Sequence, residues 1–169
     1  NVLLVSWDVG EFISEGDFDR PFNKHEVIIS SAQADSLVQN ISNWLDTIDC
    51  LDSKTKQEEL ASFSNYIKNG ADASTQLVIC NQYRIILCGF TSNMSSTDHE
   101  GLIVHELYHA FQQDLGNESC DEKINNSING RWLIEGGAEY FAQLQVMGSH
   151  SAGMSKILQL ALENYSNDI

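Results

Sequence analysis

Positively charged residues are scarce in this chain. Its 169 residues include 9 Lys and Arg but 24 Asp and Glu, which gives a formal net charge of −15. Such a surface repels the phosphates of nucleic acids and of anionic lipids, so we expect no nucleic-acid partner. The excess of acidic residues either attracts a cationic substrate or keeps the protein soluble in a salty medium.

Long apolar runs are also missing. No stretch approaches the roughly 18 apolar residues that a spanning helix needs, so no membrane insertion is expected. The composition, 42% hydrophobic and 20% charged, is typical of a globular protein, and residues 1–169 suit one domain. Because the chain begins at Asn1 rather than Met, we expect a processed or excised form, either whole or the core of a longer precursor.

The chain has no C-x-x-C pair, which argues against a zinc ribbon or a thioredoxin-type motif. Its four cysteines allow two disulfides with three possible pairings, and the alternative is buried thiols. There are also five N-x-S/T sequons, which are potential glycosylation acceptors. Together these features favour a secreted or extracellular protein. The cysteines are Cys50, Cys80, Cys88 and Cys120, and the sequons begin at Asn40, Asn93, Asn117, Asn125 and Asn164.

Proline is nearly absent, and the single Pro21 lies in the stretch 10–24, which predicts a loop. Hydrophobic periodicity predicts a mainly helical α+β fold with a small mixed β-sheet. Thr97 and Glu100 have the spacing of a capping box at the start of one helix. The expected helices are 32–48, 54–68, 97–115, 132–147 and 152–165, and the expected strands are 2–5, 27–29, 77–80 and 84–90, the last two forming a hairpin.

Residues 105 to 109 read His-Glu-Leu-Tyr-His, an H-E-x-x-H motif on a predicted helix. Residues four apart differ by about 40° around a helix axis, so His105 and His109 point the same way. Two neutral imidazoles on one face can hold Zn²⁺ at about 2.0–2.1 Å. Glu106 can reach a water on that metal and act as general base. Independent placement of these residue types predicts about 0.01 such motifs in the chain.

Two histidines do not complete a catalytic zinc site, which takes three protein ligands and leaves a fourth position to water. A third histidine at position 115 would complete a metzincin motif, but that residue is Leu115. The helix expected at 132–147 offers Glu135 and Glu139 on one face. Its small residues 136–138 include two glycines that weaken a helix, and close packing on the histidine helix would explain them.

The segments 104–112, Val-His-Glu-Leu-Tyr-His-Ala-Phe-Gln, and 132–140, Trp-Leu-Ile-Glu-Gly-Gly-Ala-Glu-Tyr, resemble the gluzincin peptidases. The second segment is most similar to bacterial collagenases and their relatives. This resemblance, which covers about residues 97–145, implies a zincin-like fold, Zn²⁺, Glu135 as third ligand and Glu139 as support for a ligand histidine. It does not imply collagen cleavage, because those enzymes are much longer.

The resulting hypothesis is a zinc endopeptidase that hydrolyses a peptide or protein substrate. Gluzincins pair an edge strand with the substrate, and the segment 84–90 is either that strand or simple sheet structure. Tyr140, His150 and Tyr165 are candidates for a second oxyanion donor.

Two other functions stay open. One is an aminopeptidase of the same clan, although the segment Gly89–Met94 lacks the Glu of the G-x-M-E-N motif that binds a free amine in those enzymes. The other is a non-catalytic metal-binding or regulatory module. A structural metal site has no need of Glu106, so the residue favours catalysis.

Overall fold

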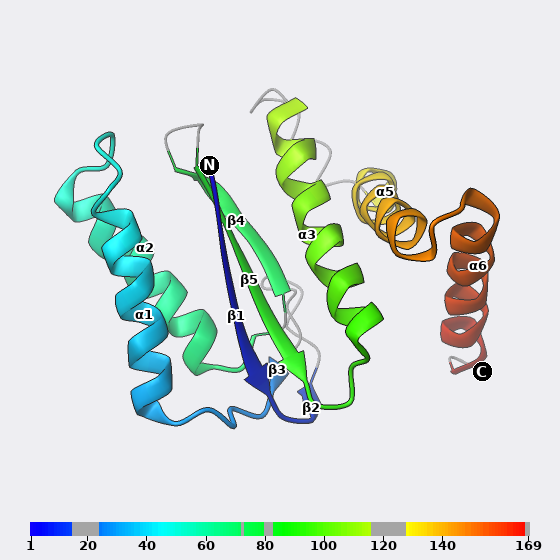
Figure 1. Cartoon of the computed structure of the whole chain (residues 1–169), viewed down its shortest axis with the longest axis horizontal. Coiled ribbons are helices and arrows are strands. Elements are labelled where there is room, and N and C mark those ends of the chain that lie inside the picture. The colour runs from blue at the N-terminus through cyan, green and yellow to red at the C-terminus, as the bar shows by residue number, and fades with distance from the viewer. Residues whose placement is uncertain (15–23, 72, 80–82, 116–127, 168–169) are drawn as a thin grey trace. The chain divides into compact units, whose positions relative to one another are not determined.

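Helices make up most of the described chain, which comprises residues 1–14, 24–71, 73–79, 83–115 and 128–167 of a computed structural model (Figure 1). The small mixed sheet confirms the expected α+β class. The chain divides into two compact units, Asn1–Met94 and Ser95–Ile169, which are described in turn. The single-domain prediction and the zincin-like fold stay predictions.

The first unit contains a three-stranded sheet with the order β1-β5-β4. β5 runs parallel to β1, with Val5 opposite Leu87, and antiparallel to β4. The antiparallel pair confirms the expected hairpin. Both edges of β5 are occupied, so the idea that segment 84–90 is a substrate-binding edge strand is wrong. The elements of this unit are β1 (Val2–Val9), β2 (Phe12–Ser14), β3 (Lys24–His25), α1 (Ser31–Leu45), α2 (Ser53–Lys68), β4 (Ala73–Ile79) and β5 (Tyr83–Thr91).

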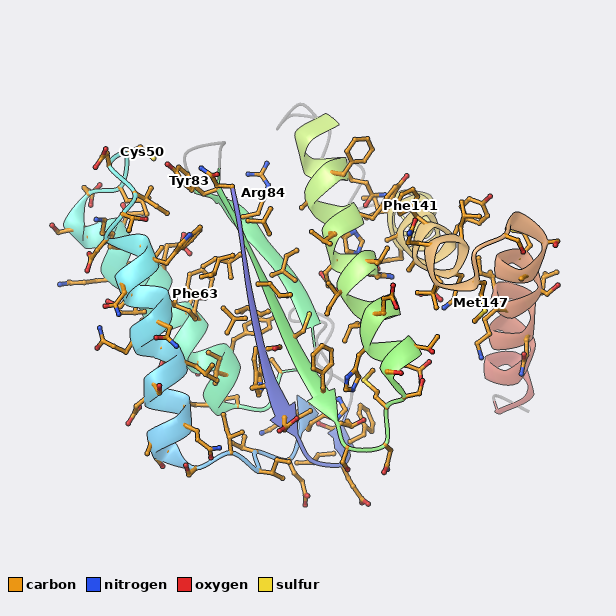
Figure 2. All side chains as sticks on the ribbon, viewed as in Figure 1. Cys50, Phe63, Tyr83, Arg84, Phe141 and Met147 are labelled. Carbon is orange, nitrogen blue, oxygen red and sulfur yellow. The ribbon has the colours of Figure 1, made fainter. Side chains whose placement is uncertain are left out.

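The core of this unit lies between one face of the sheet and the helices α1 and α2. Alternate side chains of β1 point towards the helices, as the two-residue period of a strand requires. Phe63 of α2 is 1% exposed and lies between the helices and the sheet (Figure 2). The buried cluster is Val5, Trp7, Val9, Ala34, Ile41, Leu45, Ile48, Phe63, Ile67, Ile85 and Leu87.

Two expectations for the stretch between β1 and α1 are wrong. Residues 27–29 are not a strand, and Val27 and Ile28 are about half exposed, so this apolar stretch has no sheet to join. Part of the expected loop 10–24 instead forms the short antiparallel pair β2–β3, while residues 15–23 lie outside the described part.

Of the two alternatives for the cysteines, a disulfide and a buried thiol, the described residues show one of each. Cys50 is in a disulfide, whereas Cys88, on the central strand, is a fully buried thiol. Cys80 and Cys120 lie outside the described residues.

The second unit consists, within the described residues, of α3 (Ser96–Leu115), α5 (Ile128–Met147) and α6 (His150–Asn167). α5 packs against both α3 and α6. α5 begins four residues before the expected start and ends before Gly148, whose φ of +68° suits a glycine. In the described part of the chain, no helix is long and apolar enough to cross a membrane.

The capping box of α3 is formed by a different pair of residues from the one expected. The Ser95 hydroxyl oxygen accepts a hydrogen bond from the Asp98 backbone N–H at 3.2 Å, and the Asp98 carboxylate accepts one from the Ser95 N–H at 3.2 Å. These bonds make Ser95, not Thr97, the residue that caps the helix. The sequence Ser-Ser-Thr-Asp-His-Glu offers both spacings, and the chain takes the earlier one.

Candidate metal centre

Three side chains from two helices converge in the second unit. His105 and His109 lie one turn apart on α3, and Glu135 lies on α5. The Nε2 atoms of the two imidazoles are 3.0 Å apart. The Glu135 Oε2 atom is 3.4 Å from the His105 Nε2 and 3.3 Å from the His109 Nε2. The two helices therefore bring one potential ligand atom from each residue into a single triangle.

The size of this triangle matches a zinc site. With bonds of about 2.0–2.1 Å, neighbouring ligand atoms of a tetrahedral zinc site lie about 3.3 Å apart. The three separations lie close to that value, so an ion could bind all three atoms at normal distances. The Glu135 side chain is 61% exposed, which leaves the cluster accessible from solvent.

The hydrogen bonds around His109 determine which ring nitrogen carries its proton. The Gln112 side-chain N–H donates to the Ile134 carbonyl oxygen at 3.1 Å, and a carbonyl can only accept. The Gln112 Oε1 atom must therefore be the one that lies 2.9 Å from the His109 Nδ1, and it accepts a hydrogen bond from that nitrogen. In the neutral ring this leaves the lone pair on Nε2, which faces the triangle.

His105 is oriented in a similar way by a carboxylate. Its Nδ1 lies 3.4 Å from the Glu139 Oε2 atom, and Gln143 donates a hydrogen bond to the other Glu139 oxygen at 2.9 Å. The expected pairing of Glu139 with a histidine of the motif is therefore present, and that histidine is His105. Its neutral ring likewise presents the Nε2 lone pair to the triangle.

Three lone-pair atoms that face one another at 3.0–3.4 Å repel unless a cation lies among them. Without a metal, a proton bound to a ring nitrogen can supply this positive charge. Burial lowers the pKa of His105, but the contacts with Glu135 and Glu139 outweigh it and raise the pKa to about 9. The charge of Glu106 acts in the same direction. Burial likewise opposes the charged form of His109, and contacts with Glu135 and Gln112 raise its pKa.

The carboxylates shift in the opposite sense. Contacts with His105 and His109 hold the pKa of Glu135 far below its ordinary value, and the contact with His105 lowers that of Glu139. When no metal is bound, positive charge on the His105 ring therefore compensates negative charge on the carboxylates. A bound divalent cation would supply the positive charge that compensates the carboxylates, in place of a protonated ring.

Glu106 follows His105 on α3, and only 6% of its surface is exposed. Adjacent residues of a helix differ by about 100° around the axis, so its side chain leaves α3 at the flank of the ligand face rather than on it. This placement makes Glu106 a neighbour of the triangle and not one of its members.

The two adjacent glycines of α5, Gly136 and Gly137, differ in their surroundings. A Cβ atom on Gly137 would meet the Gln112 Nε2 at 3.3 Å and the Tyr108 Cε1 at 3.4 Å, whereas one on Gly136 would meet nothing within 4 Å. The expectation of close helix packing is thus confirmed at Gly137 and wrong at Gly136. The Tyr108 ring also stacks on Phe141, with 4.9 Å between centroids.

The candidates for a second oxyanion donor stay unassigned. Tyr140 is half-buried on α5. His150 and Tyr165 belong to α6, and their side chains lie outside the described part of the structure.

Sequence reasoning missed Gln112, which contacts both helices. The available signal was its spacing, since a residue three positions after His109 is a neighbour on the helix surface. An amide at that position can accept a hydrogen bond from a ligand imidazole, but its second contact, with the Ile134 carbonyl, depends on where α5 packs.

Comparison with protein-family models, with curated proteins and with solved structures finds no match to this chain. The gluzincin resemblance therefore depends on the motif residues, and the convergence of His105, His109 and Glu135 is not specific to that family.

Proposed function

We propose that this chain is a zinc-dependent peptidase of the gluzincin type, and specifically an endopeptidase. His105, His109 and Glu135 hold the metal, and Glu106 is the general base. The single observation that supports the proposal best is the triangle of three lone-pair atoms, whose edges suit a tetrahedral zinc ion.

A zinc ion held by His105, His109 and Glu135 would lower the pKa of a coordinated water towards about 7 and would polarise a substrate carbonyl. The protein's own part is to orient and to move a proton. Glu106 accepts the proton of the attacking water and passes it to the leaving amine. Only 6% of its surface is exposed, which shields the carboxylate from bulk solvent. Glu139 and Gln112 hold the two rings with Nε2 towards the metal.

Two further features support a secreted peptidase. The disulfide at Cys50 suits an oxidising compartment, where such bonds form and persist. The exposed Glu135 side chain gives a bulky peptide access to the cluster. The substrate class we propose is therefore an extracellular peptide or protein.

The test combines metal content with hydrolysis. We expect one zinc ion per chain by mass spectrometry and cleavage of casein that a chelator abolishes and zinc restores. Matched peptides with free and acetylated N-termini should be cleaved alike. Cleavage of the free peptide alone would identify an aminopeptidase, and bound zinc without any cleavage a binding module. A chain that does not bind zinc would contradict the whole proposal.

A further inference from the structure

Gln112 contacts the metal cluster on one side and the backbone of α5 on the other. Its Oε1 lies 2.9 Å from the His109 Nδ1, and its Nε2 lies 3.1 Å from the Ile134 carbonyl oxygen. Ile134 immediately precedes Glu135 in α5. One side chain therefore links a ligand of α3 to the turn of α5 that carries the third ligand.

We propose that Gln112 is a positioning residue that sets the orientation of His109 for metal binding. The inference rests on the proposed zinc site. The direction of the hydrogen bonds carries it, because the Ile134 carbonyl can only accept and so forces the Gln112 oxygen towards the ring. The ring must then donate from Nδ1, which leaves Nε2 for the metal.

The packing around Gln112 supports this role. A glycine at position 137 leaves room for the amide group, since a Cβ there would lie 3.3 Å from the Gln112 Nε2. A carbonyl oxygen has two lone pairs, so the Ile134 oxygen can accept the Gln112 N–H and a backbone N–H of its own helix together. The amide therefore enters the helix contact without displacing an intrahelical hydrogen bond.

A purely structural role for Gln112 makes a different prediction. If its amide only joined α3 to α5, its loss would lower the stability of the zinc-free protein and leave the metal's surroundings unchanged. A positioning role predicts weaker metal binding and a changed metal spectrum. Zinc affinity and the visible absorption of the Co²⁺-substituted protein therefore separate the two.

The experiment uses two substitutions of Gln112 and one matched control. Q112L keeps the approximate size and removes both hydrogen bonds. Q112E keeps an acceptor for the His109 Nδ1–H but cannot donate to the Ile134 carbonyl. Q145L makes the same change at an exposed position of α5. Zinc affinity is measured by competition with a chromophoric chelator, and the unfolding of each zinc-free variant is recorded alongside.

We expect Q112L to bind zinc about 10- to 100-fold more weakly, the usual effect of removing a group that orients a ligand. Its Co²⁺ spectrum should change, Q112E should regain part of the affinity, and Q145L should match the wild type. Wild-type affinity and spectrum in Q112L would overturn the inference. So would a Q112E variant as weak as Q112L, since the amide would then serve the α5 backbone alone.

The outcomes also separate this inference from the proposed peptidase activity. If the wild type binds zinc and cleaves peptides while Q112L binds zinc equally well, only the inference fails. If Q112L weakens zinc binding but the wild type cleaves no peptide, the inference holds and the peptidase proposal fails. If the wild type binds no zinc, both are wrong.

Discussion

The Nε2 atoms of His105 and His109 lie 3.0 Å apart, while the outer nitrogen of each ring faces an acceptor. Those acceptors are the Glu139 carboxylate and the Gln112 amide oxygen. Both rings are therefore oriented from outside with their lone pairs directed towards each other. Such an arrangement is unfavourable in two neutral imidazoles alone, and it is what two ligands of a common cation require.

Removal of the proposed base should abolish hydrolysis without loss of the metal. E106Q keeps the size of the side chain but cannot accept the proton of the attacking water. We expect kcat to fall by about 10²- to 10⁴-fold, with zinc still bound at one ion per chain. E100Q, the same change at an exposed position of α3, is the control and should retain full activity. Wild-type turnover in E106Q would show that another group is the base.

Zinc binding should become tighter as the pH rises from 7 to 9. Without metal the pKa of His105 is raised to about 9, so its ring is protonated at neutral pH and must lose that proton to bind zinc. The apparent association constant should rise about tenfold per pH unit for this one proton and level off above pH 9. Chelator competition across this range measures the slope. A flat profile would mean that the ring is already neutral.

The same pKa shift has a consequence for the zinc-free fold. Since the pKa of His105 is raised from 6.5, its contribution to the free energy of unfolding is complete below pH 6.5 and is lost as the pH rises through about 9. E139Q removes one of the carboxylates that raise this pKa. In that variant we expect the loss of stability to occur at lower pH, as chemical denaturation at several pH values can test.

The two adjacent glycines of α5, Gly136 and Gly137, should respond differently to alanine. G136A places a methyl group in open space and should stabilise the zinc-free helix by up to about 1 kcal/mol. G137A gains the same helix propensity, but its methyl group displaces the Gln112 amide and the Tyr108 ring by a few tenths of an ångström. We expect weaker zinc binding in G137A alone. Equal affinities in the two variants would contradict the close packing.

The start of α3 offers a test that does not involve the metal. S95A removes the hydroxyl that accepts the Asp98 N–H, and we expect the free energy of unfolding to fall by about 1 kcal/mol. T97A should have a much smaller effect. In S95A the lowered pKa of Asp98, which the Ser95 hydrogen bonds cause, should also return towards its ordinary value. NMR titration of the Asp98 carboxyl measures this shift, and an unchanged pKa would assign the cap elsewhere.

The features that the sequence predicted well are local. The spacing of His105 and His109 places both on one face of any helix, because the period of the helix is the same in every fold. Periodicity likewise located α1 and α2 to within a few residues, although the last turn expected for α1 is not helical. The hairpin was also predicted, although β4 begins at Ala73, four residues before the expected start. Prediction from local residues failed where two patterns competed. At the start of α3, both Ser95 and Thr97 have an acidic residue three positions later, and the wrong one was predicted to cap the helix.

The tertiary structure decided what depends on contacts between distant residues. β5 is the central strand of its sheet only because β1, some 80 residues earlier in the chain, pairs with its other edge. Glu135 meets the two imidazoles, and Gln112 reaches Ile134, only because α5 packs closely on α3 at Gly137. A residue's sequence neighbours determine its local secondary structure and the face of the helix or strand on which it lies. What packs against that face depends on how whole helices and strands pack together. Many residues, distant in the sequence, jointly determine that packing.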